Sequence, residues 1–422
     1  MSKMPPGPAE TYDPKEKLIE WLDRYTKQYG AIFKASIYGT DAYVVSDPAL
    51  VEHVLRRNWR NYKKGQAIKR IAFLLGNGLM VSEGELWKRQ RQIVQQAFSK
   101  SSLKQLVPIV IGANARLKSK WLGAADRRES VNVTHDISQT ILEIVLKSIF
   151  GDDYEKIAPH FEIFDEESGR HLQFAQAFRG LGQHVLTIAR DRMGRGEAGA
   201  DIMGLLLCAR DPETAQPMAD ALFVNEILTL VVAGHETTAS TLNWTWYLLS
   251  QHAEVGARMA AEISQFDVTN LTDPVDLKLF PYTQRVIEEA LRLYPPGWLM
   301  TRCALADDWL GEYFVPAGTE IYISPYLIQR RPDLWEAPEN FDPDRFDNAL
   351  IGDRHVLKML PFSAGPRNCI GEAFARIEMQ LHLMLLVPWI KLSYLSSIRP
   401  ELAAEVNLRS KQDFMMVPER RL

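Results

Sequence analysis

The chain has 422 residues and a net charge of −4, and 46% of its residues are hydrophobic. This composition is typical of a globular protein with one large or two medium domains, and the nearly balanced charge argues against a nucleic-acid partner. The three cysteines, Cys208, Cys303 and Cys369, are far apart and form no C-x-x-C pair. They argue against a disulfide framework and a Cys-rich zinc site, and they fit a reducing compartment.

The N-terminal segment has a lysine but no apolar core after it, so no signal peptide is predicted. The most apolar runs, 227–233 and 381–390, are too short to span a bilayer. We therefore expect a cytoplasmic protein without a membrane anchor.

Residues 1–13 are rich in proline and predict an extended lead-in. Helices are then predicted at 15–30, 47–55 and 85–98, over most of 101–270 with the longest at 220–252, and at 282–293 and 371–387. A hairpin is predicted at 31–45 and strands near 298–305, 311–315 and 319–323. The stretches 61–84 and 331–346 are predicted to be irregular. No linker or repeat interrupts this pattern, so 14–422 should form one domain that is mainly α with a small β part.

A glycine-rich loop, Phe362-Ser-Ala-Gly-Pro-Arg-Asn-Cys-Ile-Gly371, precedes the last predicted helix. Cys369 would lie just before the helix N-terminus, where backbone N–H groups and the helix dipole stabilise a thiolate. Gly371 would let a flat ligand approach, Phe362 could pack against it, and Arg367 could reach a carboxylate on it. The alternative is a buried free cysteine, the more common case for a cysteine considered alone.

A polar motif, Ala233-Gly-His-Glu-Thr-Thr238, interrupts the most apolar predicted helix. An acid and two hydroxyls are costly in such a helix unless they are used. A threonine in mid-helix can bond the carbonyl four residues before it and open the helix locally. We expect a small notch with Glu236 and the threonines at its rim and Gly234 leaving room beside it. The alternative is purely structural pairing, and His235 is expected to pack rather than to bind a metal.

Two further sets of residues could act together. Glu289 and Arg292 share a helix face, and Arg345 could complete a buried triad that holds the segment leading to the Cys loop. A surface ion pair is the alternative. Trp87 and Arg91 are four residues apart on a basic helix, so both could face one anionic ligand.

These motifs, in this order, resemble those of the cytochrome P450 family of haem-thiolate monooxygenases from about residue 15 to the C-terminus. The Cys loop matches the F-x-x-G-x-R-x-C-x-G signature at every fixed position, and the [AG]-G-x-[DE]-T-T, E-x-x-R and P-x-R-F motifs match as well. The resemblance implies a single-domain, mainly α fold that binds haem b and uses O2 as co-substrate.

The resemblance also implies a role for each matching residue. Cys369 would be the axial ligand of the iron, and Glu236 and Thr237 the acid–alcohol pair that delivers protons. Glu289, Arg292 and Arg345 would be a structural triad. The residues implied to bind the haem are Trp87, Arg91, Ala233, Gly234, Arg302, Phe362, Arg367, Cys369 and Gly371. Those implied to line the substrate pocket are Val231, Trp298, Leu299 and Phe414.

The expected reaction is insertion of one oxygen atom of O2 into a mostly apolar organic molecule. The second hypothesis is a haem-thiolate peroxygenase or isomerase that needs no electron donor, although such enzymes commonly lose the Glu236–Thr237 pair. The third is a haem sensor or helical scaffold without catalysis.

Electrons are expected from a separate ferredoxin or flavodoxin served by an NAD(P)H-dependent reductase, and the protein is expected to be a monomer. A basic surface of Lys88, Arg89, Arg354, Lys358 and Arg376 could receive such an acidic partner. Arg367 and the segment 343–346 look closer to the microsomal branch of the family. The stretch 151–201 is compact for the two helices that usually roof the pocket.

Overall fold

The computed structural model describes residues 3–164, 172–211, 213–347 and 358–421. The chain forms two compact units, and each is assembled from stretches that are far apart in the sequence. Unit 1 comprises Met1–Arg70, Glu288–Cys369 and Glu401–Lys411, and unit 2 comprises Ile71–Ile287, Ile370–Pro400 and Gln412–Leu422. Because the chain passes between the units several times, neither unit is a continuous piece of sequence.

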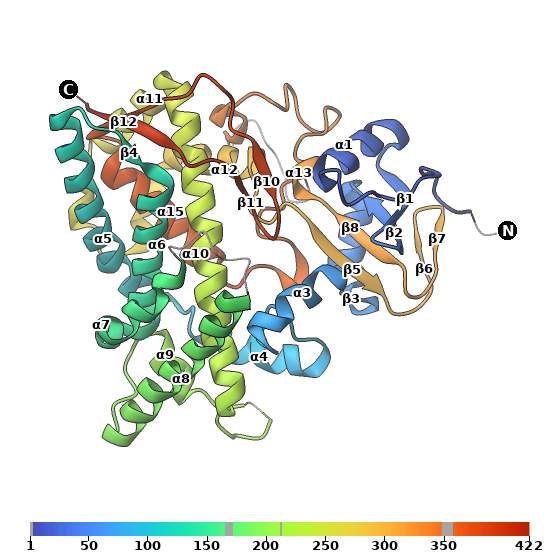
Figure 1. The fold of residues 1–422 in the computed structure, drawn as a ribbon, viewed down its shortest axis with the longest axis horizontal. Coiled ribbons are helices and arrows are strands. Elements are labelled where there is room, and N and C mark those ends of the chain that lie inside the picture. The colour runs from blue at the N-terminus through green and yellow to red at the C-terminus, as the bar shows by residue number, and fades with distance from the viewer. Residues whose placement is uncertain (1–2, 165–171, 212, 348–357, 422) are drawn as a thin grey trace. The chain divides into compact units, whose positions relative to one another are not determined.

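Unit 1 is built on a mixed five-stranded sheet in the order β1-β2-β8-β5-β3. Its strands are β1 (Ile32–Ile37), β2 (Thr40–Val45), β3 (Tyr62–Lys64), β5 (Met300–Ala304) and β8 (Glu320–Ile323). β2 pairs with β8 in parallel and the other neighbours are antiparallel. N-terminal strands therefore lie side by side with strands from the last third of the chain (Figure 1). The smaller elements are α1 (Leu18–Tyr29), α2 (Pro48–Glu52), α13 (Pro325–Ile328), the hairpin β6 (Asp308–Leu310) and β7 (Tyr313–Val315), and the hairpin β10 (Leu402–Ala404) and β11 (Leu408–Ser410).

Both faces of this sheet are covered, as the two-residue alternation of its strands requires. Tyr43 and Val45 of β2 point into one apolar cluster, whereas Ala42 and Val44 point into the other. The second cluster is closed by α1. The first contains Leu360 and Ala364, the residues with which the chain enters the Cys loop. The hydrophobic core of unit 1 thus fixes the start of that loop.

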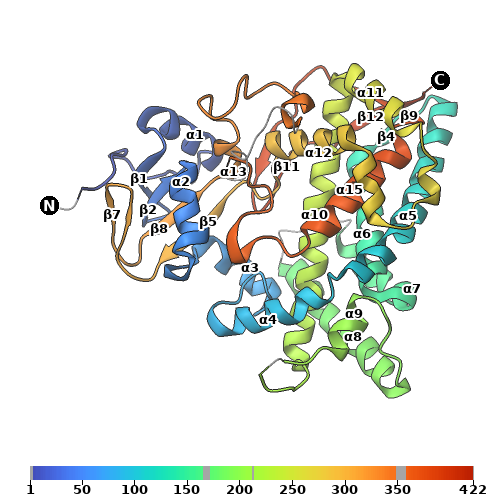
Figure 2. The ribbon, with the colours of Figure 1, turned by 180° about the vertical axis from the view of Figure 1, so that it is seen from behind.

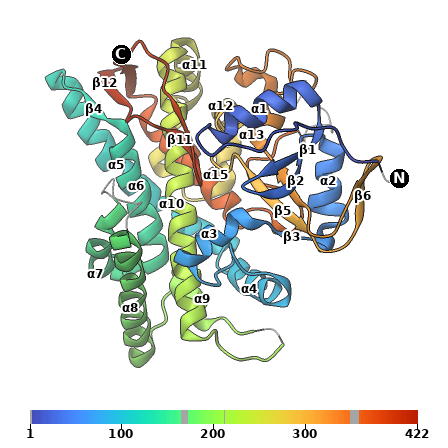
Figure 3. The same ribbon diagram turned by 45° about the vertical axis from the view of Figure 1, so that its right-hand side comes forward.

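Unit 2 is a helical bundle around one long helix, α10 (Asp220–Gln251). Figure 3 shows α6 (Val133–Phe150) alongside α10, and Figure 2 shows α15 (Glu372–Leu386) against α5 (Lys100–Arg127) and α10. The other helices are α3 (Gln66–Leu75), α4 (Gly84–Gln96), α7 (Tyr154–Ile157), α8 (Leu172–Arg195), α9 (Ile202–Cys208), α11 (Ala253–Ile263) and α12 (Pro281–Leu293), of which α3 and α12 run from one unit into the other. A small sheet in the order β4-β12-β9 joins β4 (Val131–Asn132), β12 (Met415–Arg420) and β9 (Ile390–Tyr394).

The mainly α fold with a small β part is confirmed, and the bounds of α1, α4, α10, α12 and α15 agree with the predicted helices within three residues. The prediction of an irregular stretch at 61–84 is wrong, because the chain there forms β3 and α3. Its glycines bound these elements instead of breaking them. Gly76 ends α3 with a positive φ of 56°, a conformation that glycine adopts without strain.

The predicted hairpin at 31–45 turns at Tyr38 and Gly39, between β1 and β2. Tyr38 and Gly39 both have positive φ, 52° and 74°, as a two-residue turn that follows the twist of its strands requires. The lead-in of residues 3–12 is extended and is bonded along the edge of unit 1. Lys34 donates its N–H to the Pro6 carbonyl over 2.8 Å, and Tyr12 donates to Ser36 over 2.9 Å. Among the residues described, no helix combines the length and apolarity that crossing a bilayer would need.

Candidate active site

The Cys loop is a compact, hydrogen-bonded turn in unit 1. It contains a short 3-10 helix, Gly365–Arg367, with positive φ at Ser363 and Gly365. The Cys369 N–H donates to the Phe362 carbonyl over 2.9 Å, which closes the turn. The cysteine itself is exposed, so it is not the buried free cysteine of the alternative interpretation. Its sulfur is therefore accessible as a ligand.

Glycine is required at position 365 for two reasons. The residue has φ of 75°, and a Cβ there would clash with the backbone carbonyl of Leu55. The loop consequently lies directly on the backbone that follows α2. Gly371 precedes the first residue of α15, where an added Cβ would meet only Phe98 Cε1 at 3.9 Å. The helix that follows the cysteine begins three residues after it, at Glu372.

The predicted triad comes together in unit 1. Glu289 binds Arg292 through two bonds of 2.6 and 2.8 Å, and its Oε1 also accepts from Arg345 Nε at 2.9 Å. The side chains of Glu289 and Arg292 have no exposed surface. Arg292 also donates to the carbonyls of Pro338 and Asn340. A buried carboxylate with two guanidinium partners therefore ties α12 to the aperiodic segment before the Cys loop, and this is not the surface pair of the alternative.

The polar motif on α10 coincides with a break in that helix's burial. All residues of 238–249 are buried, whereas Val232, Ala233, Gly234 and Thr237 are half-buried and Glu236 is exposed. Thr237 Oγ1 donates to the Ala233 carbonyl over 2.7 Å, the bond to the fourth preceding residue that was predicted. The helix nevertheless stays continuous, so the predicted local opening is not seen. Its polar face is accessible without a break in the helix.

Gly234 and His235 connect this motif to α6. A Cβ on Gly234 would meet Val145 Cγ2 at 3.2 Å, so the glycine allows close packing of α10 on α6. His235 is buried, and its Nε2 lies 2.9 Å from Ser138 Oγ and 3.1 Å from the Ser138 carbonyl. Since the carbonyl can only accept, Nε2 carries the hydrogen. Burial lowers the pKa of His235 to about 4. It is therefore a neutral packing residue, as predicted.

The helix that carries Trp87 and Arg91 is tied to α10 by a residue the sequence did not single out. Gln90 Nε2 donates to Glu226 Oε1 over 2.5 Å and to the Asn77 carbonyl over 2.7 Å, and Glu226 Oε2 accepts from the Leu79 N–H. Trp87 is buried on the same face of α4, and Arg91 is half-buried. Within unit 2, therefore, α4 is anchored on the helix that bears Glu236 and Thr237.

Two arginines that are also predicted to bind the haem, Arg302 and Arg367, lie in unit 1. Arg302 is on β5, half-buried, and donates to the Thr301 carbonyl over 2.9 Å. Arg367, in the Cys loop, has its guanidinium 6.0 Å from the centre of the Trp59 ring. Trp87 and Arg91 thus lie in unit 2, and Arg302 and Arg367 lie in unit 1.

The residues predicted to line the substrate pocket are mostly core residues. Val231, Trp298 and Phe414 have at most 3% of their surface exposed. Trp298 packs between α1 and the sheet and donates its indole N–H to Glu405, while Phe414 stacks with Tyr247. Side chains so enclosed offer almost no surface to a ligand. That these three residues line a substrate pocket stays a prediction, and Leu299 is half-buried.

Two fully buried titratable residues on α15 were also missed. His382 accepts from Trp246 Nε1–H over 2.9 Å, and its Nδ1 lies 2.7 Å from Asn114 Oδ1. Burial lowers the pKa of His382 to about 3. Burial raises the pKa of Glu378 well above its usual range. His382 is therefore neutral near pH 7, and burial favours the neutral form of Glu378.

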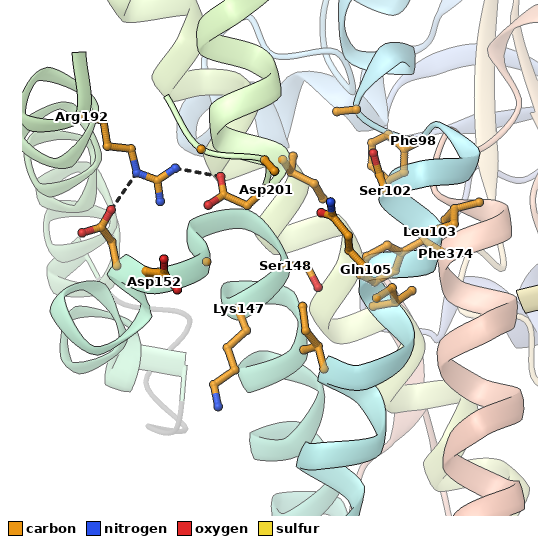
Figure 4. A pocket seen from close by; sticks show the side chains of 18 of the residues that line it. Phe98, Ser102, Leu103, Gln105, Lys147, Ser148, Asp152, Arg192, Asp201 and Phe374 are labelled. Atoms are coloured by element: carbon orange, nitrogen blue, oxygen red, sulfur yellow. Dashed lines mark hydrogen bonds and ion pairs between the residues drawn. The ribbon is translucent and has the colours of Figure 1, made fainter. Parts of the chain in front are cut away.

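A pocket of about 490 Å³ lies in unit 2 between α5, the end of α6 and the segment that joins α8 to α9 (Figure 4). Its charged wall centres on Arg192, which donates to Asp153 over 2.7 Å and to Asp201 over 2.8 Å. The guanidinium also binds the carbonyls of Phe150 and Ala198. Four of the five N–H donors of this arginine are used in joining α6, α8 and α9, so we assign the charged wall to packing.

Comparisons with known proteins decide the family. A sequence model described as Cytochrome P450 matches residues 7–174 and 154–412. The chain belongs to the cytochrome P450 family. It is 31% identical to cyclooctat-9-en-7-ol 5-monooxygenase of Streptomyces melanosporofaciens, over 84% of this chain and 80% of that one. It is 29% identical to the chloroplastic carotene epsilon-monooxygenase of Arabidopsis thaliana, over 86% and 74%.

The fold agrees with this assignment. The crystal structure of the cytochrome P450DA heme domain superposes with a TM-score of 0.85 at 24% identity, covering 99% of this chain and 97% of that one. Family membership and the named monooxygenase relatives make this protein a haem-dependent monooxygenase. The residues present fit the haem, because the Cys369 thiol is exposed and the polar face of α10 is accessible.

Proposed function

We propose that this P450 inserts one oxygen atom of O2 into an unsaturated, largely hydrocarbon molecule. Two relatives are named for carotene and for cyclooctat-9-en-7-ol, and both names denote such molecules. A substrate of this kind has few groups to hydrogen-bond, so shape and apolar contact would orient it. A hydroxyl or an epoxide would be the simplest product.

In this proposal Cys369 holds the haem iron through its sulfur, and Trp87, Arg91, Arg302 and Arg367 hold the propionates. Phe362 and Gly371 would lie against the ring from the Cys loop, and Ala233 and Gly234 would border it on α10. Haem b supplies the redox chemistry and the activation of O2 when it is bound. The triad of Glu289, Arg292 and Arg345 would support the cysteine side.

Glu236 and Thr237 would handle protons. The exposed Glu236 carboxylate can exchange protons with water. The Thr237 hydroxyl hydrogen is engaged by the Ala233 carbonyl, which leaves the oxygen lone pairs able to accept a hydrogen bond from a water molecule or acid. The single observation that carries the proposal is this pairing of an exposed acid with an accessible, back-bonded threonine, in a chain whose Cys369 is exposed.

Electrons would come from a ferredoxin or flavodoxin with an NAD(P)H-dependent reductase. Lys88, Arg89, Lys358 and Arg376 would form the basic docking surface, while Arg354 lies outside the described residues. Lys88 is exposed, with its Nζ 3.4 Å from Glu85. Lys88→Glu should slow reduction in a salt-dependent manner, and unchanged reduction would place the docking surface elsewhere. A monomer in the cytoplasm remains a prediction.

The test has two parts. The reduced protein with carbon monoxide should show the thiolate-type Soret shift, and Cys369→Ala should lose it. Turnover of carotenes and cyclic terpene hydrocarbons is then compared with NADPH plus a ferredoxin system and with peroxide alone. A higher coupled rate with peroxide would favour the peroxygenase alternative, and an absent Soret shift in the wild type would refute the haem-thiolate assignment.

A further inference from the structure

Gln329 is a fully buried amide that joins two segments of unit 1. It follows α13, and none of its surface is exposed. Its Nε2 donates to the carbonyls of Leu291 and Arg292 over 3.1 and 2.9 Å. Its Oε1 accepts from the N–H of Leu360 over 2.9 Å. Both hydrogens of the amide nitrogen and its oxygen are therefore used, which is the full pairing expected of a buried amide.

One end of this link is rigid. The donated bonds reach the last turn of α12, and Arg292 Nη1 returns a bond of 2.8 Å to the carbonyl of Gln329 itself. The side chain of each residue thus binds the main chain of the other. Arg292 is fixed in turn by the carboxylate of Glu289. Gln329 consequently extends from the buried triad and not from a mobile loop.

The other end leads to the cysteine through a short series of bonds. The Leu360 side chain is buried, and its carbonyl accepts from the Ser363 N–H over 3.1 Å. Pro361, whose ring restricts its backbone, then leads to Phe362. The Phe362 carbonyl accepts from the Cys369 N–H. Holding the Leu360 N–H in place therefore also holds the Phe362 carbonyl, which accepts the hydrogen bond from the Cys369 N–H.

We propose that Gln329 is a positioning residue for Cys369, transmitting the rigidity of the buried triad to the Cys loop through Leu360. This inference rests on the proposed role of Cys369 as the haem ligand. The position requires a neutral side chain with two donors and one acceptor. A carboxylate there would be repelled by the carbonyl oxygens of α12. An apolar side chain would leave the Leu360 N–H buried without a hydrogen-bond partner.

Gln329→Met keeps the length of the side chain and removes its hydrogen bonds. In the haem-loaded protein we expect hydrogen–deuterium exchange of a peptide spanning 358–363 to become ~10-fold faster or more. We also expect the fraction of carbon monoxide complex with the thiolate-type Soret shift to fall roughly twofold or more, because the loop around the ligand loses its support.

The matched control is Gln380→Met. Gln380 is also a buried amide that bonds a main-chain carbonyl, Leu277, over 2.7 Å, but it lies in unit 2 on α15. Both variants should lose stability, whereas only Gln329→Met should change the Soret spectrum and exchange at 358–363. Gln329→His offers one donor and one acceptor and should restore part of both signals.

Three results would overturn the inference. The first is an unchanged thiolate fraction in Gln329→Met, and the second is an equal loss of it in Gln380→Met. The third concerns the wild type alone: its Leu360 amide would undergo hydrogen–deuterium exchange as fast as an amide in an open loop. A wild type that lacks the thiolate-type Soret shift would instead refute the proposed function, so the two failures are distinguishable.

Discussion

Acid should destabilise unit 2 through His382, which the fold keeps neutral. Asn114 Nδ2 donates to the Val110 carbonyl, so its Oδ1 faces the histidine and Nδ1 of His382 carries the hydrogen. Nε2 already accepts from Trp246. A second proton would displace the indole N–H and place a charge between α5, α10 and α15. Burial of the ring between these helices lowers its pKa to about 3.

The size of the effect follows from linkage. In the unfolded chain the histidine binds a proton near its ordinary pKa of 6.5, whereas in the folded protein it does not until about 3. The stabilisation is therefore complete above 6.5 and is lost as the pH falls toward 3. At about pH 5 the loss amounts to roughly 2 kcal/mol, from 1.36 kcal/mol per tenfold change in proton concentration.

The assay is urea unfolding at about pH 8 and about pH 5, followed by tryptophan fluorescence. His382→Gln keeps a polar, non-titrating side chain, so the free energy it loses between these pH values should be about 2 kcal/mol smaller than in the wild type. His135→Gln, which replaces an exposed histidine on α6, should behave as the wild type does. An equal acid loss in the wild type and His382→Gln would refute the reasoning.

Three other substitutions test the site and its support. Thr237→Ala should lower product formed per NADPH by ~10-fold or more while leaving the Soret shift intact, and unchanged coupling would contradict the proton-delivery role. Glu289→Ala leaves Arg292 and Arg345 without their buried countercharge and should lower the free energy of unfolding by about 3–5 kcal/mol. The loss should be measured as a lower thermal midpoint and weaker haem retention. A loss under about 1 kcal/mol would fit only a surface ion pair. Because the pKa of Glu378 is raised, the folded wild type should lose stability as the pH rises above the ordinary pKa range of a glutamate. Glu378→Gln should therefore gain stability relative to the wild type from about pH 5 to pH 8. Urea midpoints that change in parallel for the two proteins would argue against this effect.

Features that depend on local spacing could be predicted from the sequence. The bounds of α10 and the bond from Thr237 to Ala233 both follow from the helical repeat. The contact of Glu289 with Arg292 also lies within one helix turn. The strands β9 and β12 were missed because they are defined by their pairing with each other and, for β12, with β4. An edge strand without its partner carries little signal in a chain that is otherwise helical.

The substrate-pocket residues were predicted from the family's topology alone, and they stay predictions. Trp298 and Phe414 were placed in a pocket by analogy, yet each fills an apolar core with its own aromatic or strand partners. Large aromatic side chains bury much surface, so packing is their more common role.

Polar residues at buried positions give further information that can be obtained from the sequence. His382 lies between Leu381 and Leu383 on the apolar α15, and Gln329 follows Ile328 in a buried turn. A polar side chain in such a place must find a hydrogen-bond partner, so its position alone predicts a partner. It does not predict which one, because Asn114 and Leu360 are brought near only by the fold. The role proposed for Gln329 in supporting the Cys loop therefore depends on knowing that its partner is Leu360.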